Sequence, residues 1–189
     1  MSDSTTDTKA NNEASTGRQI LETLIMIAIA FALAQFVKTY VVQPFVIPSG
    51  SMIPTIQLDN RVLAEKLTYR FSRGPQYGEI AVFRNPAGYP PILIKRVIAT
   101  QGQVVDLREG KVFINNDELS ESYVHGLPTL PESPAIEYPY TVPDGHVWMM
   151  GDNRTNSGDS REFGPVAVDQ VMGRAFWTYW PPTQFGTLK

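Results

Sequence analysis

A single continuous apolar run, residues 20–42, constrains this chain more than any other feature of its sequence. The centre of the run, from Leu24 to Leu33, carries no charged residue. A helix needs about 20 predominantly apolar residues to span the hydrocarbon core of a bilayer. The run reaches that length if Lys38 extends its amine to the interface and Tyr40 lies at the same level. We therefore predict a transmembrane helix over residues 20–42.

Two alternatives to a transmembrane helix remain open for this run. Residues 32–34, Ala-Leu-Ala, are similar to the cleavage site of a secretory signal peptide, although the polar stretch before the run is long and not clearly basic. A helix buried in a soluble fold would be amphipathic, whereas this run is apolar on every face. Residues 1–19 are polar and are predicted to be a disordered tail. Lys9 and Arg18 in this tail slightly favour a cytoplasmic N-terminus.

The composition excludes several classes of chemistry. The chain of 189 residues is long enough for one domain with a small insertion. It contains no cysteine, which excludes disulfides, thiol nucleophiles and thiolate metal sites, and only two histidines, which disfavours a multi-histidine metal site. Its net charge of -3 argues against nucleic acid as the main partner. We expect no metal, no cofactor and no nucleic-acid partner.

After the apolar run the sequence changes to short segments with a period of two, which is typical of strands. Seven such segments are predicted: 61–67, 79–83, 92–99, 103–108, 111–114, 146–150 and 171–179. Residues 115–145 are rich in Pro, Ser, Glu and Tyr and lack this period, so we predict a small inserted cap. The fold class is mainly β, with a barrel-like or paired antiparallel sheet of residues 43–114 and 146–182 after the transmembrane helix. Residues 183–189 are predicted to be a C-terminal tail.

The stretch 46–55, directly after the apolar run, is predicted to form a rigid turn. Pro48 and Pro54 each fix φ and remove a backbone donor. Gly50 allows a tight turn between two serines. Ser51 is therefore held at a turn close to a membrane surface, where it could serve as a nucleophile. An ordinary Ser-Gly turn is the alternative.

A serine hydroxyl is a poor nucleophile at neutral pH and needs a base. His125 and His146 lie in or beside the Pro-rich segment, with no evident carboxylate to orient them. Lys95 shares one face of a predicted strand with Leu93 and Val97, where loss of hydration would lower the pKa of its amine. A neutral amine can accept the serine proton. Alternatively, Lys95 protects the edge of a sheet from aggregation.

The loop 151–164 concentrates polar and charged residues beside an apolar strand. Its members include Asp152, Asn153, Arg154, Ser157, Asp159, Ser160 and Arg161. Such a cluster cannot be buried without partners, so we predict a network of Asp–Arg ion pairs that fixes the loop. A solvated loop is one alternative. A calcium loop is another, but the EF-hand spacing is missing.

Three stretches of this chain, 48–55, 95–97 and 151–161, resemble in order and spacing the successive motif boxes of the type I signal peptidases. The preceding membrane segment matches as well, so the resemblance covers roughly residues 20–180. Each box alone is weak, and the combination is specific. One departure is visible in residues 98–103, where the family usually carries Gly-x-Pro-Gly-Asp. This chain keeps the glycine but not the proline or the acid, which leaves the hairpin geometry open.

The resemblance implies a role for each group. Ser51 would attack the scissile carbonyl and Lys95 would be the general base, without metal or cofactor. Ser49 would supply a hydroxyl to the oxyanion hole beside the Ser51 backbone N–H. The base-orienting and loop-fixing network would consist of Ser157, on the Lys95 amine, with Asp159, Arg161, Asp152 and Arg154. The pockets for small residues at −1 and −3 of the substrate would be lined by Phe45, Ile47, Met52, Ile56 and Ile94.

The resemblance also implies a function. The expected protein is a membrane-anchored serine endopeptidase that removes signal peptides from preproteins after Ala-x-Ala sites, in the lipid bilayer and near the secretion translocon. We expect a single-pass protein of the inner or plasma membrane with its catalytic domain on the extracytoplasmic side, or of a thylakoid-type membrane. A self-cleaving Ser–Lys protease related to SOS-response repressors is one alternative. A catalytically silent, anchored binding domain is another.

Overall fold

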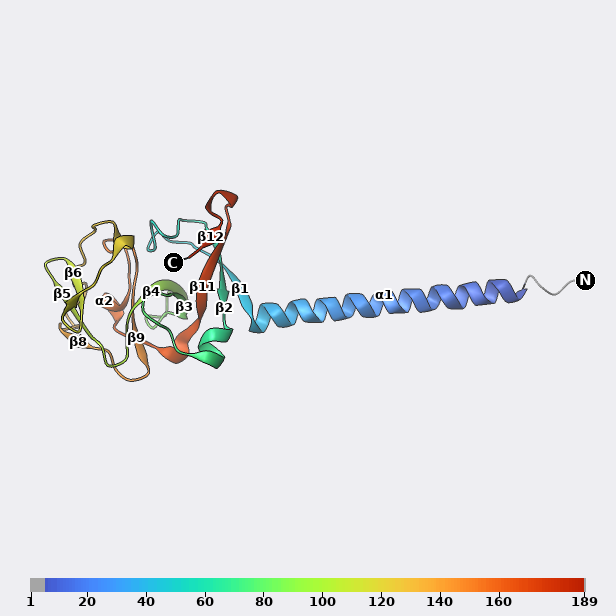
Figure 1. Cartoon of the computed structure of the whole chain (residues 1–189), viewed down its shortest axis with the longest axis horizontal. Coiled ribbons are helices and arrows are strands. Elements are labelled where there is room, and N and C mark those ends of the chain that lie inside the picture. The colour runs from blue at the N-terminus through green and yellow to red at the C-terminus, as the bar shows by residue number, and fades with distance from the viewer. Residues whose placement is uncertain (1–5, 189) are drawn as a thin grey trace, which may run out of the picture. The chain divides into compact units, whose positions relative to one another are not determined.

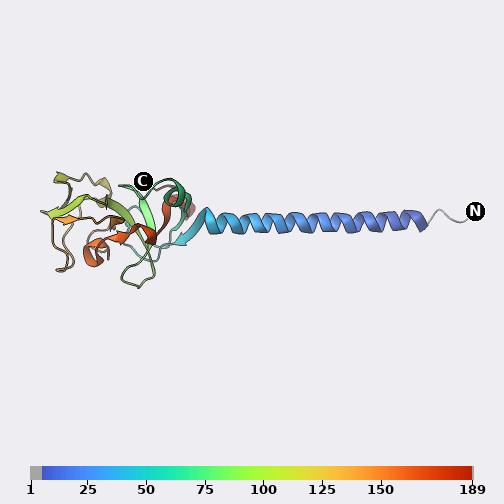
Figure 2. The same cartoon turned by 90° about the horizontal axis from the view of Figure 1, so that it is seen from below.

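The computed structural model describes residues 6–188 and comprises two compact units, Met1–Val41 and Val42–Lys189. The first unit is a single helix, α1 (Thr6–Tyr40), which Figures 1 and 2 show as one continuous element. Its apolar part, Gly17–Tyr40, is 24 residues long, and none of it is buried by protein. Within the described residues, it is the one helix whose length and composition suit a membrane span.

The helix is longer than the sequence predicted. It begins at Thr6, so residues 6–19 are helical where we expected disorder, and residues 1–5 of that tail lie outside the described residues. Once the apolar run has nucleated a helix, each added residue costs little, and the Ala, Lys, Glu and Gln of this stretch are good helix formers. The helix ends at Tyr40 rather than at residue 42, because the β-branched Val42 opens the first strand.

The second unit is built around a large antiparallel sheet (Figure 1). Its strands are β1 (Val42–Val46), β2 (Arg61–Glu65), β3 (Ile80–Arg84), β4 (Ile92–Thr100), β9 (His146–Met150), β10 (Val166–Ala167), β11 (Val171–Trp180) and β12 (Gly186–Thr187). They are ordered β1-β2-β11-β3-β4-β9-β10, and β12 pairs with β11. Register shifts interrupt β11 and the β4–β9 pairing, and such irregularities increase local twist. The result is a curled half-barrel.

A smaller antiparallel sheet completes this unit. It contains β5 (Val104–Arg108), β6 (Lys111–Ile114), β7 (Asp117–Glu118) and β8 (Tyr140–Thr141), in the order β7-β6-β5-β8. Short helical turns occupy Thr68–Ser72, Ser122–Val124, Val168–Gln170 and Pro182–Gln184, and α2 spans Ser160–Phe163. The predicted class, an N-terminal apolar helix followed by a mainly antiparallel β fold, is confirmed.

The internal boundaries differ from the expected ones. Strands β5 and β6, which we assigned to the core segment 43–114, belong to the small sheet, because β8 from within the predicted cap pairs with β5. The predicted tail 183–189 contributes β12 to the large sheet. Both differences arise from pairings between distant strands, which the period of a single strand does not encode.

The core covers both faces of the large sheet. Strand β3 alternates between them: Ile80 and Val82 join one cluster, and Ala81 and Phe83 join another. The first core cluster contains Ile47, Met52, Ile56, Val62, Ala64, Ile80, Val82, Ile94 and Ala175. The second contains Ala81, Phe83, Val97, Val147, Met149 and Val166. A third contains Ile98, Ala99, Val105, Val112, Val142, Trp148 and Met150, and joins the two sheets.

Phe83 tests this arrangement, because its ring is fully buried in the second core cluster. Replacing it in Phe83→Ala removes about 3–5 kcal/mol from the free energy of unfolding, through lost burial and the cavity that remains. Equilibrium urea unfolding of the detergent-solubilised full chain measures the change. Phe71→Ala is the matched control, because Phe71 is 75 % exposed, and it should cost well under 1 kcal/mol. Equal losses in the two variants would contradict the core described here.

Candidate active site

Ser51 lies in a turn that is held from two sides. On one side, Met52 and Ile56 belong to the first core cluster. On the other, Asn153 donates its backbone N–H to the Ser51 carbonyl (3.0 Å) and its side-chain amide to the Gly50 carbonyl (3.0 Å). Ser51 is 8 % exposed. The turn is therefore fixed by packing and by hydrogen bonds, as the prolines in the sequence predicted.

The loop 151–164 can approach this turn because Gly151 has no side chain. A Cβ at this position would lie 2.5 Å from the Ser51 carbonyl oxygen and would collide with the Ser157 hydroxyl. Only glycine allows so close a contact between the two backbones. The two loops form one unit around the serine.

Lys95 lies in the middle of the large sheet, on β4 between β3 and β9, and not on a sheet edge. Its neighbours on the same face, Leu93 and Val97, pack in the second core cluster. The lysine is 2 % exposed, and its Nζ donates to the Ser51 Oγ over 2.5 Å. Burial lowers the pKa of Lys95 to about 8, an effect that the nearby Asp159 carboxylate partly opposes. At this pKa, a substantial fraction of the amine is neutral near pH 8.

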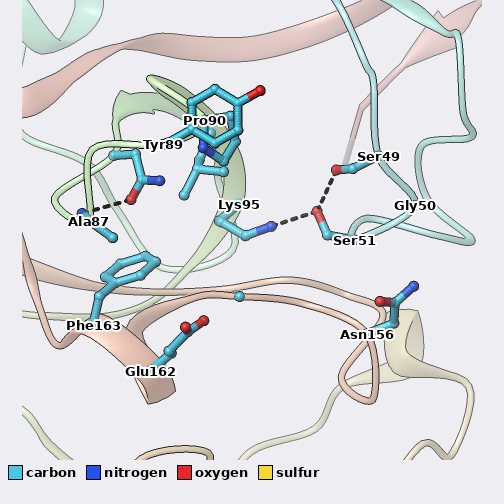
Figure 3. A pocket seen from close by; sticks show the side chains of 13 residues that line it. Ser49, Gly50, Ser51, Ala87, Tyr89, Pro90, Lys95, Asn156, Glu162 and Phe163 are labelled. Carbon is cyan, nitrogen blue, oxygen red and sulfur yellow. Dashed lines mark hydrogen bonds between the residues drawn. The ribbon is translucent and has the colours of Figure 1, made fainter.

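Two hydrogen-bond donors lie next to the Ser51 hydroxyl. The Ser49 Oγ is 3.5 Å from the Ser51 Oγ (Figure 3). The Ser51 backbone N–H donates to no protein acceptor within residues 6–188. Both are the groups that the resemblance implied as oxyanion donors, and that role stays a prediction.

Asp159 and Arg161 form the buried ion pair that the sequence predicted, with 2.9 Å between Arg161 Nη2 and Asp159 Oδ2. Asp159 also accepts from the Gly151 N–H (3.0 Å) and from the Ser157 hydroxyl (2.8 Å). Ser157 uses its proton on Asp159 and keeps lone pairs that can accept from the Lys95 amine, so its orienting role stays a prediction. A carboxylate is a stronger acceptor than a neutral amine, so the hydroxyl turns to Asp159.

Asp152 pairs with a residue that sequence reasoning assigned no role. Its carboxylate accepts two hydrogen bonds from Arg96, of 2.9 and 2.7 Å, and both side chains are buried. It also accepts from the Thr55 hydroxyl (2.5 Å), which belongs to the serine turn. Arg96 follows Lys95 on β4 and lies in the same motif box. That position was the one signal in the sequence that could have identified Arg96 as a residue of the site. The pair connects the strand of the lysine to the turn of the serine.

Arg154 also pairs outside its own loop. It forms an ion pair with Glu121 of the cap (2.5 Å) and donates to the Thr129 hydroxyl (2.7 Å). The Tyr123 ring lies 4.0 Å from the guanidinium of Arg96 and 5.9 Å from that of Arg154. The cap therefore supplies a carboxylate and an aromatic ring to two buried arginines. Nothing in the sequence of the cap marked these residues.

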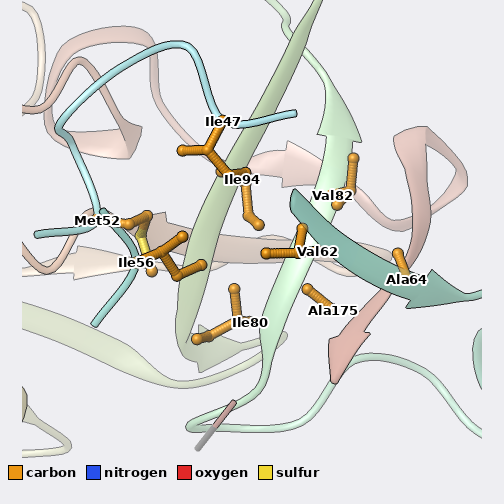
Figure 4. Packing of buried hydrophobic residues seen from close by; sticks show 9 residues of the cluster. All are labelled: Ile47, Met52, Ile56, Val62, Ala64, Ile80, Val82, Ile94 and Ala175. Carbon is orange, nitrogen blue, oxygen red and sulfur yellow. The ribbon is translucent and has the colours of Figure 1, made fainter. Parts of the chain in front are cut away.

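The five predicted pocket residues pack together in one region of the core. Ile47, Met52, Ile56 and Ile94 are buried in the first core cluster (Figure 4), and Phe45 packs against that cluster. Burial of apolar surface is favourable, and these side chains fill the space around one another. The five side chains therefore form one closely packed group, and their role as a substrate pocket stays a prediction.

A cavity of about 330 Å³ lies on the other side of Lys95 (Figure 3). It is lined by Ser49, Gly50, Ser51, Asn85, Ala87, Tyr89, Pro90, Leu93, Lys95, Asn156, Gly158, Glu162 and Phe163. Most of these come from the turn 48–55, the loop 85–91 and the segment 156–163. Sequence reasoning missed the loop 85–91 and α2 as walls of the site, since neither carries a periodic pattern.

The alternatives raised by the sequence find no support in this geometry. His146 lies next to the Asp144 carbonyl (2.8 Å), and neither His146 nor His125 lines the cavity. Asp152 and Asp159, the candidate calcium ligands, each accept hydrogen bonds from a buried guanidinium. Within the described ranges, no group of three His, Cys, Asp or Glu side chains could hold a metal ion. A buried serine hydroxyl bonded to a lysine amine remains the arrangement that can perform acyl transfer.

Comparison with known proteins identifies the family of this chain. Residues 20–180 match the family model of signal peptidase, peptidase S26. Probable signal peptidase I-1 of Synechocystis sp. (strain ATCC 27184 / PCC 6803 / Kazusa) is 37% identical over 176 residues, which cover 89% of this chain and 87% of that protein. Thylakoidal processing peptidase 1, chloroplastic, of Arabidopsis thaliana is 37% identical over 78% of this chain and 44% of its own length.

A solved structure, that of a signal peptidase I from Enterococcus faecalis V583, is 31% identical and covers 54% of this chain and 97% of its own, with a TM-score of 0.48. The sequence matches define a hydrolase of the signal peptidase type, and the apolar helix α1 agrees with a membrane-anchored enzyme. The chain belongs to the signal peptidase family, peptidase S26, whose members remove signal peptides as serine proteases.

The buried Arg96–Asp152 pair yields a stability prediction. Asp152→Asn leaves the Arg96 guanidinium buried without a carboxylate, which lowers the free energy of unfolding by about 3–5 kcal/mol. Urea unfolding followed by tryptophan fluorescence measures it. Glu118→Gln, which breaks the exposed Lys111–Glu118 pair, is the matched control and should cost less than about 1 kcal/mol. A loss no larger than that of the control would show that the buried pair is not needed.

Proposed function

We propose that Ser51 and Lys95 are the catalytic dyad of a membrane-anchored endopeptidase that cleaves preproteins after Ala-x-Ala signal-peptide sites. The observation that carries this proposal is the 2.5 Å hydrogen bond between Lys95 Nζ and Ser51 Oγ in a buried setting. A base within hydrogen-bond reach of its nucleophile, with a pKa near the working pH, is what general-base catalysis requires.

Acylation begins when neutral Lys95 takes the Ser51 proton and the Ser51 oxygen attacks the scissile carbonyl carbon. The tetrahedral oxyanion accepts hydrogen bonds from the Ser51 backbone N–H and the Ser49 hydroxyl, which both lie beside the nucleophile. The lysinium then protonates the leaving amine, and the C–N bond breaks. The mature protein departs, and the signal peptide stays bound to Ser51 as an ester.

Deacylation repeats these steps with water. Lys95, neutral again, takes a proton from the water that attacks the ester carbonyl. The second tetrahedral intermediate collapses, the Ser51 oxygen regains a proton from the lysinium, and the signal peptide leaves as a free carboxylate. No metal or cofactor enters either half of the reaction.

The preference for small residues at −1 and −3 is part of the proposal. The first core cluster extends to the site through Met52 and Ile94. These two residues are the sequence neighbours of the dyad residues. Because that cluster is closely packed, a methyl group fits against it at small cost, whereas a large side chain would force its members apart. Ion pairs of the loop hold this surface and the dyad in fixed relative positions. The loop residues that form them are Asp159, Arg161, Asp152 and Arg154.

The proposed setting is a membrane. Helix α1 spans the bilayer through residues 17–40, with the second unit on the extracytoplasmic side and close to the secretion translocon. The substrate is itself held in the bilayer by its signal peptide, so shared confinement raises its effective concentration. The name of one relative, a thylakoidal processing peptidase, supports a thylakoid-type membrane, and an inner or plasma membrane is the other location that we propose.

Variants of the dyad provide the test. Ser51→Ala removes the nucleophile, and Lys95→Ala should lower kcat by ~10²–10⁴, the usual value of general-base assistance. Cleavage of a preprotein with an Ala-x-Ala site by the detergent-solubilised full chain is the measurement, with circular dichroism to verify folding. Lys111→Ala, which removes an exposed lysine, is the control and should retain full activity. Near-full activity of Lys95→Ala would place the base elsewhere, and an inactive, well-folded parent protein would favour the partner-binding alternative.

The pH dependence gives a separate prediction. Burial lowers the pKa of Lys95 from 10.5 to about 8, and only the neutral amine is a base. The value of kcat/KM should therefore rise about tenfold per pH unit below pH 8 and level off above it, because this parameter reports the free enzyme. Initial rates with a quenched fluorescent peptide between pH 5.5 and 10 would measure the profile. A midpoint near 6.5 would indicate histidine instead.

A further inference from the structure

The active-site cavity contains one charged group that the mechanism does not use. Glu162 is the single carboxylate among the described residues that line it, and Figure 3 shows its side chain below Lys95. This carboxylate forms no hydrogen bond or ion pair within residues 6–188. An unpaired carboxylate beside a substrate cavity is available to a cation of the substrate.

The backbone that carries Glu162 is held firmly. Its neighbours Ser160 and Arg161 on α2 are buried, and the Ser160 hydroxyl accepts from the Met149 N–H (2.9 Å). Asp159 caps the helix by accepting from the Arg161 N–H (3.1 Å). The position of Glu162 at the cavity is therefore a consequence of the loop network and not of a free surface turn.

The carboxylate itself rests against Gly158. A Cβ at this position would lie 2.8 Å from the Glu162 Oε2. A methyl group there would push the carboxylate out of its place without removing its charge. Gly158→Ala therefore tests whether the position of the Glu162 carboxylate matters while its charge is kept.

The mechanism decides which part of the substrate enters this cavity. Lys95 must deliver its proton to the leaving amine, so the residues that follow the scissile bond lie on the Lys95 side of Ser51. The cavity extends in that direction: in Figure 3, Lys95 lies between Ser51 and the group formed by Tyr89 and Phe163. The first residues of the mature protein therefore contact its walls.

The walls suit a long side chain with a positive end. Leu93, Pro90 and Phe163 present apolar surface to an aliphatic stem, and Tyr89, which is 88 % exposed, presents its ring to a cation. Glu162 supplies the counter-charge. Among the described residues that line the cavity, Lys95 is the one cation, and its amine is neutral while it acts as a base.

We propose that Glu162 is a specificity-determining residue that selects a basic side chain, and disfavours an acidic one, at positions +1 to +3 after the scissile bond. The proposal rests on the function proposed above, since the direction of the cavity follows from the Ser51–Lys95 mechanism. A partly exposed ion pair contributes about fivefold at most, and repulsion of a like charge has a similar magnitude. The combined preference for Lys over Glu is therefore ~10-fold.

The test uses the detergent-solubilised full chain and quenched fluorescent peptides that share one Ala-x-Ala site. Each peptide carries Lys, Met or Glu at +1, +2 or +3, and the readout is the ratio of kcat/KM for Lys over Glu. We expect ~10-fold at one of these positions for the parent protein, at most about twofold for Glu162→Gln, and an intermediate ratio for Gly158→Ala. Glu137→Gln removes an exposed carboxylate that does not line the cavity and should leave the ratio unchanged. A ratio near one in the parent protein, or one that survives Glu162→Gln, overturns the proposal.

A binding measurement separates this inference from the proposed reaction. Ser51→Ala and the double variant Ser51→Ala/Glu162→Gln are titrated with the same peptides, labelled for fluorescence anisotropy. Tighter binding of the Lys peptide, lost in the double variant, supports the role of Glu162 even if the parent protein cleaves none of the peptides. Equal binding of Lys and Glu peptides, or no binding, overturns it, whatever the outcome for cleavage.

Discussion

Removing one amine from water is the event on which the rest of this structure depends. An ammonium group in the interior costs several kcal/mol, and the protein meets that cost by letting the pKa of Lys95 fall to about 8. The position of β4 between β3 and β9 and the closely packed serine turn bury most of this side chain, which is 2 % exposed. The same exclusion of water makes the amine a base.

Arginine side chains stay charged when they are buried, so the protein pairs them with carboxylates instead. Arg96, Arg154 and Arg161 are as buried as the lysine, but each receives a carboxylate of its own. These carboxylates come from the loop and from the cap, so three segments far apart in sequence are held together by paired charge. The result is a site with one unpaired nitrogen base among fully paired guanidinium groups. The pairing keeps the field at Lys95 balanced, since Asp159 and Arg161 act on its pKa in opposite directions.

The sequence predicted what depends on local pattern. Period-two segments identified the main strands, and the motif boxes identified Ser51, Lys95 and the Asp159–Arg161 pair. What depends on tertiary contact was missed. The pairing of Arg154 with Glu121 joins two regions without any shared pattern, and the pairing of β8 with β5 moved the boundary of the cap. The cavity walls were missed because loops contribute them, and loops have no period.

The register of β4 carries a consequence for how this protein can change. Lys95 pairs with Ala81 across β3, and side chains of a strand alternate between faces. A shift by one residue would exchange Lys95 for Ile94 or Arg96 at the nucleophile. A substitution near the site therefore changes one contact at a time, whereas the loss or gain of one residue within β4 would turn Lys95 to the opposite face of the sheet. For this site, the number of residues along β4 is as much a determinant as the identity of any side chain.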